Sequence, residues 1–309
     1  MTTYDILVPG DYFCDVVFCG VPRMPTLGTE IYTEALTVTI GGALNTVIAM
    51  KRLGLRVGWI ARLGNDMFSR MALEAVEREG IDTALVERFD HPYQRVTVSL
   101  SFPEDRAFVS YVDPGPGLLA MTRSVVKRVD YRHLHLAGLN IGPDACALFD
   151  AAHVRGADVS MDCQEHNKSL SDPAVAEALS KVDVFMPNAT EAMRLTGVGN
   201  IEDAGELLHA ATRCAVIKDG PRGAACWRDG QAWYGPALPV TPIDTTGAGD
   251  VFNAGFLKAW LDGARPQECL RWGNVCGGLS TLGLGGAASA PTRERAERVL
   301  NGADPLASR

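Results

Sequence analysis

The sequence predicts an α/β protein with a central, mostly parallel β-sheet and helices on both faces. Short runs of β-branched and aliphatic residues alternate with longer amphipathic runs along most of the 309 residues, a pattern typical of parallel sheets with helical crossovers. The composition, 47% hydrophobic and 21% charged, is that of a globular chain and excludes disorder and collagen-like structure. A chain of this length can bury a large core without disulfides or structural metal ions.

The elements of this sheet follow one another along the chain. We expect strands at residues 6–9, 57–62, 133–137, 158–161, 182–186 and 215–219. Helices are expected at residues 44–53, 68–79, 144–155, 174–181, 191–196 and 203–211. The uncharged stretch 272–292 has the length of a membrane span but contains six glycines. It therefore predicts a buried helix followed by a glycine-rich loop.

Two segments interrupt the alternation and predict a second, smaller sheet. Residues 15–18 with 31–39, and 95–102 with 107–112, are expected to form paired strands. In the second pair, Val96, Val98, Leu100 and Phe102 alternate with polar residues, which makes one face apolar. A few strands cannot bury such a face by themselves. We therefore expect residues 11–40 and 92–112 to form a β lid over a main domain of residues 1–10, 41–91 and 113–309; an edge hairpin packed on the core is the alternative.

Charge and cysteine content limit the classes of partner. The chain has 37 acidic and 29 basic residues, a net charge of −8 and no basic block, which argues against nucleic acid or an anionic membrane as the main partner. No basic segment precedes an apolar one at the start of the chain, so we expect a cytoplasmic protein. None of the eight cysteines forms a C-x-x-C pair, and we expect them to be reduced core residues.

Polar and glycine-rich motifs follow most of the predicted strands. In an open parallel sheet, ligands bind at the carboxyl ends of the strands. The motifs at those ends occupy residues 10–15, 41–45, 139–140, 162–166, 187–191, 218–223 and 244–250. Their convergence at one edge of the sheet predicts a single ligand site.

The most informative motif is Asp244-Thr245-Thr246-Gly247-Ala248-Gly249-Asp250, which precedes a helical stretch. Small residues at a helix start leave backbone N–H groups approachable, and the helix dipole strengthens their attraction for an anion. An aspartate beside such a site can accept a proton from an attacking hydroxyl group. The alternative is a glycine turn whose acidic residue only suits the helix dipole.

This motif resembles the second signature of the ribokinase-like sugar kinases, the phosphofructokinase-B (pfkB) family. The segment Gly41-Gly42-Ala43-Leu44-Asn45, with Leu63-Gly64-Asn65-Asp66 further along the chain, is similar to the first signature of that family. Pro187-Asn188-x-x-Glu191 resembles its N-x-x-E motif. The motifs occur in the order of the family, and the resemblance implies its three-layer fold with a β lid.

The resemblance also assigns roles to individual residues. It makes Asp250 the base that activates the acceptor hydroxyl. It also implies that the N–H groups of Gly247, Ala248 and Gly249 hold the transferring phosphate. The residues implied in sugar binding are Asp15, Gly41, Gly42, Asn45 and Asn140, although the family usually has an acid at the last position.

Nucleotide and metal sites are implied in the same way. The nucleotide positions are Asn188, Lys218, Gly220, Gly223 and Asn274, with Lys218 in place of the usual hydroxyl residue. Glu191 would act on Mg²⁺ through water, although Asn-x-x-Glu before a helix is also a capping box. The positions matching a monovalent-cation site, which potassium would suit, are Asp244, Thr246, Ser280, Gly283, Gly285 and Ser289.

The expected function is that of an ATP- and Mg²⁺-dependent kinase acting on a small sugar, with a neutral pentose or hexose preferred. A nucleoside is the alternative acceptor, and a non-catalytic sugar or nucleotide sensor is the alternative class. The resemblance further suggests a homodimer joined through the lid sheet. The chain has no G-x-x-x-x-G-K-[ST] motif, which argues against a Walker-type ATPase. We interpret the G-x-G-like segment 115–120 as a loop, and His133 and His135 as core or surface residues.

Overall fold

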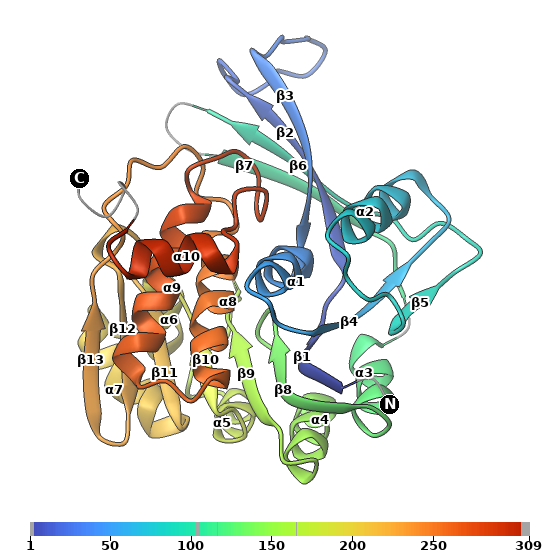
Figure 1. The fold of residues 1–309 in the computed structure, drawn as a ribbon. Helices are drawn as coiled ribbons and strands as arrows, with labels where there is room; N and C mark the ends of the chain where they lie inside the picture. Colours follow the sequence, from blue (N-terminus) through green and yellow to red (C-terminus); the bar gives the residue numbers. More distant parts are fainter. Residues whose placement is uncertain (1–2, 103–105, 116, 165, 304–309) are drawn as a thin grey trace.

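A nine-stranded sheet forms the centre of the computed structural model, which describes residues 3–102, 106–115, 117–164 and 166–303 (Figure 1). Its strand order is β13-β12-β11-β10-β9-β8-β1-β4-β5. Pairing is parallel from β11 to β5, and β12 and β13 are antiparallel. The strands are β1 (Thr3–Pro9), β4 (Val57–Leu63), β5 (Val86–Arg88), β8 (Asp130–Leu136), β9 (Asp158–Asp162), β10 (Val184–Met186), β11 (Cys214–Lys218), β12 (Ala224–Arg228) and β13 (Gln231–Gly235).

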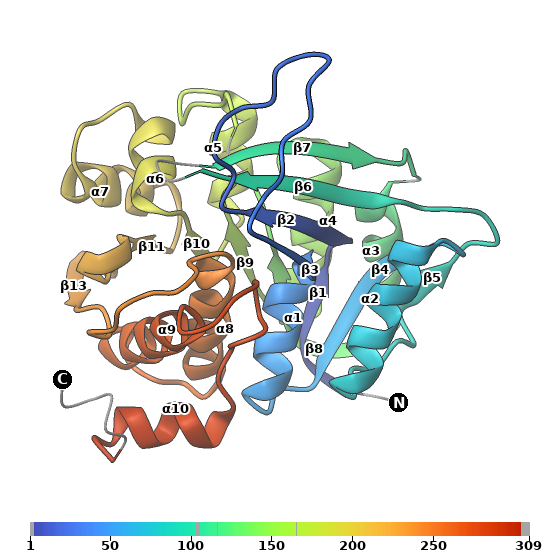
Figure 2. The same cartoon turned by 90° about the horizontal axis from the view of Figure 1, so that it is seen from above.

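Helices cover both faces of this sheet, which gives three layers (Figures 1 and 2). One hydrophobic core lies under α1 (Ala43–Arg52), α2 (Met67–Arg78), α8 (Ala248–Leu261), α9 (Pro266–Ser280) and α10 (Arg293–Leu300). The other core lies under α3 (Leu118–Val126), α4 (Pro143–Val154), α5 (Pro173–Ser180), α6 (Ala189–Thr196) and α7 (Ile201–Ala211). Ile6, Leu7 and Val8 in β1 are fully buried, as expected for a central parallel strand with helices on both faces.

A separate four-stranded sheet projects beyond the end toward which the arrowheads of β8 and β9 point (Figure 1). Its order is β3-β2-β6-β7, with bounds β2 (Tyr12–Cys19), β3 (Ala35–Gly42), β6 (Arg95–Ser101) and β7 (Arg106–Val112). Strands β2 and β6 are parallel, and the other two pairs are antiparallel. The small sheet therefore lies at the carboxyl ends of the parallel strands, where the motifs of the sequence converge.

The register of the small sheet separates its side chains into two faces. Thr39, Asp15, Thr97 and Ser110 oppose one another across the four strands, so they share a face, which we call the polar face. The other face, called the apolar face, consists of Cys14, Val16, Phe18, Leu36, Val38, Ile40, Val96, Val98, Leu100, Ala107, Val109 and Tyr111. Cross-strand neighbours point to the same side of a sheet.

The predicted fold class and the alternating elements are confirmed, with shifts of a few residues at their ends. Three differences stand out. The strand expected at 31–39 begins only at Ala35, β12 and β13 were not predicted, and part of segment 115–120 belongs to helix α3. That helix has an apolar side, with Val125 and Val126 buried, which explains why it forms; residue 116 lies outside the described residues. No helix in the described ranges has the length and apolar character needed to span a membrane.

Candidate active site

Four residues from four elements meet where the polar face of the small sheet approaches the main sheet. Asp15 comes from β2, Gly41 from β3, Asn45 from the first turn of α1 and Asp250 from the first turn of α8. A Cβ atom at Gly41 would collide with the Asp15 carboxylate and lie 3.6 Å from Asn45 Nδ2. Asn45 Nδ2 donates to Asp250 Oδ2 across 3.1 Å. The structure therefore brings together three of the residues predicted to bind sugar and the predicted base.

Two side chains of α1 orient the Asp250 carboxylate. Asn45 donates to one oxygen, and Thr46 Oγ1 donates to the other across 3.2 Å. Asn45 is itself fixed, because its Oδ1 accepts from Ala287 N across 3.1 Å. Thr46 was not singled out in the sequence, since its role depends on the packing of α1 against α8.

The carboxyl groups of Asp15 and Asp250 both have raised pKa values, because each is buried near another carboxylate. Burial, followed by the charge of Asp250, raises the pKa of Asp15 to about 6. Burial and the charge of Asp162 raise the pKa of Asp250 to about 6, against the hydrogen bonds from Asn45 and Thr46 and the charge of Lys218. Buried carboxyl groups that also face a negative charge bind protons more tightly than free ones. The aspartate predicted to act as a base is thus more basic than a solvent-exposed one.

We predict that these raised pKa values appear in the pH profile of the enzyme. The base role predicted for Asp250 requires its ionised form, so with that role kcat/KM for the acceptor should fall as the pH drops through about 6. Because Asp15 titrates in the same range, the decline should approach two protons rather than one. Initial rates between pH 5 and 8 at fixed ATP would measure it. A rate that stays constant down to pH 5 would contradict the raised pKa values.

The glycine turn before α8 leaves backbone donors available. Gly247 adopts a left-handed conformation with φ 69° and ψ 3°, and an added Cβ would approach Gly286 Cα to 2.9 Å. The N–H of Ala248 donates to the Thr245 carbonyl across 3.2 Å. Within the described part of the chain, the N–H groups of Gly247 and Gly249 have no hydrogen-bond partner. Two of the three predicted donors are therefore open to an anion in this state.

A buried ion pair lies beside this turn. Lys218 Nζ is 2.8 Å from Asp162 Oδ1 and 3.2 Å from Asn253 Oδ1. Neither Asp162 nor Asn253 was assigned a role from the sequence, although segment 162–166 follows a predicted strand. Their contact with Lys218 joins β9, β11 and α8, which only the fold brings together.

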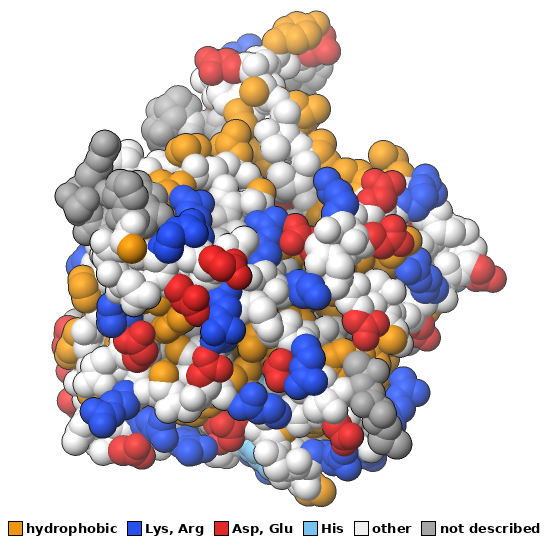
Figure 3. Space-filling model, viewed as in Figure 1, with side chains coloured by type: hydrophobic (Ala, Val, Ile, Leu, Met, Phe, Trp, Pro, Cys, Tyr) orange, Lys and Arg blue, Asp and Glu red, His pale blue; other side chains and the backbone are white. Residues whose placement is uncertain are grey.

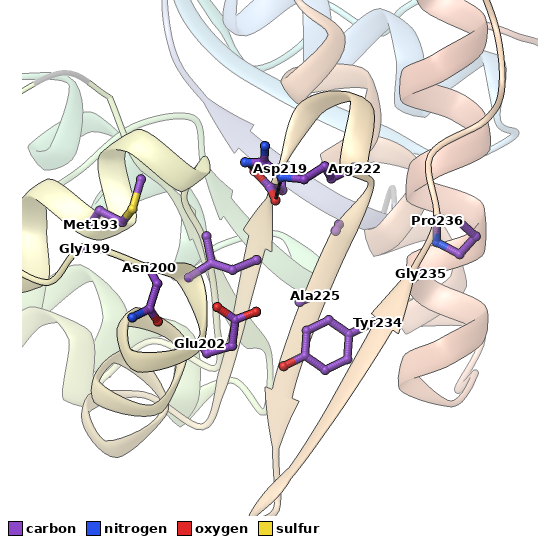
Figure 4. Close-up of a pocket in the computed structure, with 12 residues that line it drawn as sticks. Met193, Gly199, Asn200, Glu202, Asp219, Arg222, Ala225, Tyr234, Gly235 and Pro236 are labelled. Carbon is purple, nitrogen blue, oxygen red and sulfur yellow. Dashed lines mark hydrogen bonds and ion pairs between the residues drawn. The ribbon is translucent and has the colours of Figure 1, made fainter.

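The predicted nucleotide loop forms a tight turn between β11 and β12. Gly220 has φ 54° and Gly223 has φ 99°, and a Cβ at Gly223 would collide with the Gly235 carbonyl oxygen. Asn274 Nδ2 donates to the same Gly235 carbonyl across 3.0 Å. Beside the loop is a pocket of about 680 Å³ whose lining includes Asp219, Arg222, Glu202 and Tyr234 (Figure 4).

Asn188 and Glu191 form a complete capping box at the start of α6. Asn188 Oδ1 accepts from Glu191 N across 2.9 Å, and Asn188 N donates to Glu191 Oε2 across 2.8 Å. Burial and the charge of Asp162 raise the pKa of Glu191, and they outweigh the hydrogen bond from Asn188, which lowers it. The capping box considered as the alternative role of these residues is therefore present. Among the described residues, the second carboxylate oxygen of Glu191 has no hydrogen-bond partner and is left for another ligand.

The carboxylate groups at this site suit an Mg²⁺ ion that is held mainly by water and by the phosphates of a nucleotide. No group of three His, Cys, Asp or Glu side chains able to hold a metal ion occurs among the described residues. Mg²⁺ is typically bound by one or two carboxylates together with water and substrate phosphates. The carboxylate of Glu191, in the field of Asp162, fits that pattern.

The positions predicted to bind a monovalent cation come together in two facing loops. Asp244 Oδ1 accepts from Thr246 N and Oγ1 across 2.9 and 2.7 Å, and its Oδ2 accepts from Gly285 N across 2.8 Å. Although burial raises it, these bonds hold the pKa of Asp244 below its usual range. Arg106 of the lid donates to Thr246 Oγ1 across 2.9 Å. Two of the other predicted positions also have intramolecular contacts: Ser280 Oγ donates to Gly277 O across 2.8 Å, and Ser289 Oγ fills the space next to Gly283.

Asn140 has a local hydrogen bond, because its side-chain amide donates to the Gly138 carbonyl across 2.7 Å. Its part in sugar binding stays a prediction. His133 and His135 are fully buried and share the Ser160 hydroxyl at 2.7 and 2.8 Å, so they are core residues. The pKa of each is lowered by burial, to about 4 and about 3.

A buried cluster of charged side chains, which was not predicted from the sequence, lies at the base of the small sheet. Asp11 pairs with Arg62 at 2.5 Å and with Arg95 at 2.9 Å, and Tyr93 Oη donates to Asp11 across 3.0 Å. Each charged side chain in it is at most 12% exposed. The cluster therefore ties β6 of the lid to the end of β1.

Comparison with known proteins places these observations in a family. The family model described as pfkB family carbohydrate kinase matches residues 23–293. The chain is 27% identical to a ribokinase of Haemophilus influenzae over 91% of this chain and 94% of that protein. It is 29% identical to an ATP-dependent ribose-1-phosphate kinase of Halopiger xanaduensis, over 91% and 93%. A structure of Arabidopsis thaliana ribokinase complexed with ribose and ATP has the same fold, with a TM-score of 0.81, 22% identity and coverage of 96% and 98%.

Proposed function

Since this chain belongs to the pfkB family of carbohydrate kinases, we propose that it transfers the γ-phosphoryl group of ATP to a hydroxyl group of a small neutral sugar, a pentose or a hexose. The observation that carries the proposal is the approach of Asp250 to Asp15 and Asn45 beside a turn with open N–H groups. That arrangement would supply a base, an acceptor site and an anion site around the Asn45 side-chain amide.

The reaction follows from these positions. The acceptor oxygen forms a bond to the γ-phosphorus, the bond from that phosphorus to the bridging oxygen of ADP breaks, and the hydroxyl proton passes to Asp250. The N–H groups of Gly247 and Gly249 stabilise the charge on the transferring group. Asp15 and the second N–H of the Asn45 amide hold neighbouring hydroxyl groups of the sugar. Mg²⁺, when bound near Glu191, would neutralise phosphate charge.

The lid arginines favour a neutral acceptor. A phosphorylated or carboxylated acceptor needs convergent arginine or lysine side chains. Arg95 is paired with Asp11, and Arg106 donates to Thr246. The two arginine side chains in the strands of the small sheet are therefore both engaged by the protein itself in this structure.

A nucleoside is the second candidate acceptor, and one observation supports it. Phe13 and Phe108 lie on the polar face of the lid, the same face as Asp15. Phe108 is 59% exposed. An exposed aromatic ring near the acceptor site could stack on a base. Tyr111, considered with them from the sequence, lies on the apolar face instead.

A panel of acceptors tests the substrate class. ADP release would be measured with Mg-ATP and, separately, neutral pentoses and hexoses, nucleosides, and sugar phosphates such as ribose 1-phosphate. We expect the highest kcat/KM with a neutral sugar. A preference for sugar phosphates would overturn the inference from the lid arginines, and a preference for nucleosides would favour the role of Phe13 and Phe108.

We propose that residues 11–40 and 92–112 act as a lid and also join two copies of the chain. The apolar face of the lid sheet holds twelve side chains without a charge. Leu36 and Val109 on it are 57% and 67% exposed, and hydrophobic side chains are visible on the projecting part of the molecule (Figure 3). A second copy would cover this face with an equally apolar one, while the polar face stays toward the sugar.

We predict a dimer of twice 33.1 kDa by light scattering at micromolar concentration. Val109→Glu should give a monomer, because it places a charge in the apolar face. Val154→Glu is the matched control, since Val154 is 87% exposed on α4. Hydrogen exchange should show residues 92–112 better protected with acceptor bound. A wild-type monomer would refute the dimer, and equal protection with and without acceptor would refute the lid.

A further inference from the structure

Lys218 is fixed at the centre of the site by its backbone and its side chain. Its N–H donates to the Pro187 carbonyl across 3.0 Å, and a bridge pairs it with Asn188. The carboxyl ends of β10 and β11 are therefore tied together at this residue. From that point the side chain extends toward α8, and only 12% of it is exposed.

The ammonium group is held in a closed ring of three side chains. It donates to Asp162 Oδ1 across 2.8 Å and to Asn253 Oδ1 across 3.2 Å, and Asn253 Nδ2 donates to Asp162 Oδ2 across 2.6 Å. An ammonium group has three N–H donors. Among the described residues the third donor has no acceptor.

This third donor lies next to the glycine turn. A Cβ atom at Gly249 would lie 3.5 Å from Lys218 Nζ and 3.9 Å from its Cδ and Cε atoms. The lysine stem therefore packs across Gly249, whose own N–H is open to an anion. The charge of Lys218 also lowers the pKa values of Glu191 and Asp250, against the effect of burial on both groups.

We propose that Lys218 is a catalytic residue that binds the phosphoryl group during its transfer, with Asp162 and Asn253 as its positioning residues. This inference rests on the proposed kinase function. The third N–H of the ammonium adds a full positive charge to the two backbone donors of the turn. Negative charge on the transferring group is stabilised by such a fixed cation. A hydroxyl residue at this position could supply one hydrogen bond but no charge.

The alternative is that Lys218 only neutralises the buried carboxylate of Asp162. The two roles predict different nucleotide preferences. A lysine that touches the γ-phosphoryl group distinguishes ATP from ADP, whereas a lysine that only compensates Asp162 affects both equally. Binding of nucleotides without turnover can therefore separate them.

The test compares Lys218→Gln and Lys218→Arg with the wild type. Gln keeps an N–H donor without the charge, and Arg keeps the charge. Dissociation constants would be measured by calorimetry for ADP and for a non-hydrolysable ATP analogue, both with Mg²⁺, followed by kcat. Lys258→Met is the matched control, because Lys258 is also a buried lysine on an ion pair, with Asp262 near the end of α8. Thermal melting would show that each variant is folded.

In Lys218→Gln, the analogue should bind about tenfold to hundredfold more weakly, the range for a lost hydrogen bond to a charged group. ADP binding should change less than threefold, and kcat should fall with Arg restoring part of it. Equal losses for ADP and the analogue, or no loss of either, would overturn the proposal. If no acceptor supports turnover, the kinase function fails, while the two dissociation constants still decide whether Lys218 contacts the terminal phosphate.

Discussion

Replacing Asp250 with asparagine should lower kcat by two to four orders of magnitude while the fold and ATP binding are retained. The substitution keeps the size of the side chain and one of its two acceptor oxygens, and it removes the charge and the ability to accept the hydroxyl proton. General-base catalysis is typically worth about 10²–10⁴-fold. The hydrogen bonds from Asn45 and Thr46 hold the carboxylate in place, so its position is already suited to that role.

Stopped assays of ADP release at saturating acceptor would measure this loss, with ATP binding determined by calorimetry. Asp262→Asn is the matched control, because Asp262 lies at the other end of α8 and its side chain is 56% exposed. Turnover of Asp250→Asn within about tenfold of the wild type would remove Asp250 from the role of base.

Replacing Asp15 with alanine should raise KM for the acceptor by about tenfold to hundredfold, with little change in KM for ATP. The acceptor site then loses its strongest hydrogen-bond acceptor, and bonds to a charged group are worth about 1.5–3 kcal/mol. Asp15 lies beside Gly41 and within the field of Asp250.

The same variant has an independent signature in its pH profile. The charge of Asp250 raises the proton affinity of Asp15, and an interaction between two titrating groups acts on both of them. Without Asp15, the pKa of Asp250 should fall, and the acidic limb of kcat should move to lower pH. A normal acceptor KM together with a raised KM for ATP would contradict the assignment of Asp15 to the acceptor.

The main sheet could be predicted because its parallel strands are nearly uniform apolar runs. Ile6, Leu7 and Val8 in β1 are buried on both sides of the sheet, and the helices between strands have one apolar side. The β12–β13 hairpin was missed, although Asp229-Gly230 at its tip is a sequence typical of a two-residue hairpin turn. Both residues have positive φ, 51° and 70°, as a type I′ turn requires.

The residues that meet at the candidate site could be found in the sequence because each belongs to a contiguous motif. Asn45 and Asp250 each lie in the first turn of a helix that follows glycine residues, and that local pattern is visible without a structure. The contacts of Lys218 could not be predicted, because Asp162 and Asn253 are 56 and 35 residues away from it. Only the order of β9 and β11 around β10, and the packing of α8, bring the three side chains together.

The proposed phosphoryl transfer is best tested by the stoichiometry of ADP release with Mg-ATP and the preferred neutral sugar. Phosphorus NMR would identify the product in the same sample. We predict one ADP and one phosphomonoester of the sugar for each acceptor consumed, with no free phosphate formed at a comparable rate. The result that would contradict the account is an absence of ADP release across sugars and nucleosides by a protein that binds both ATP and an acceptor. That result would indicate a sugar or nucleotide sensor on this fold.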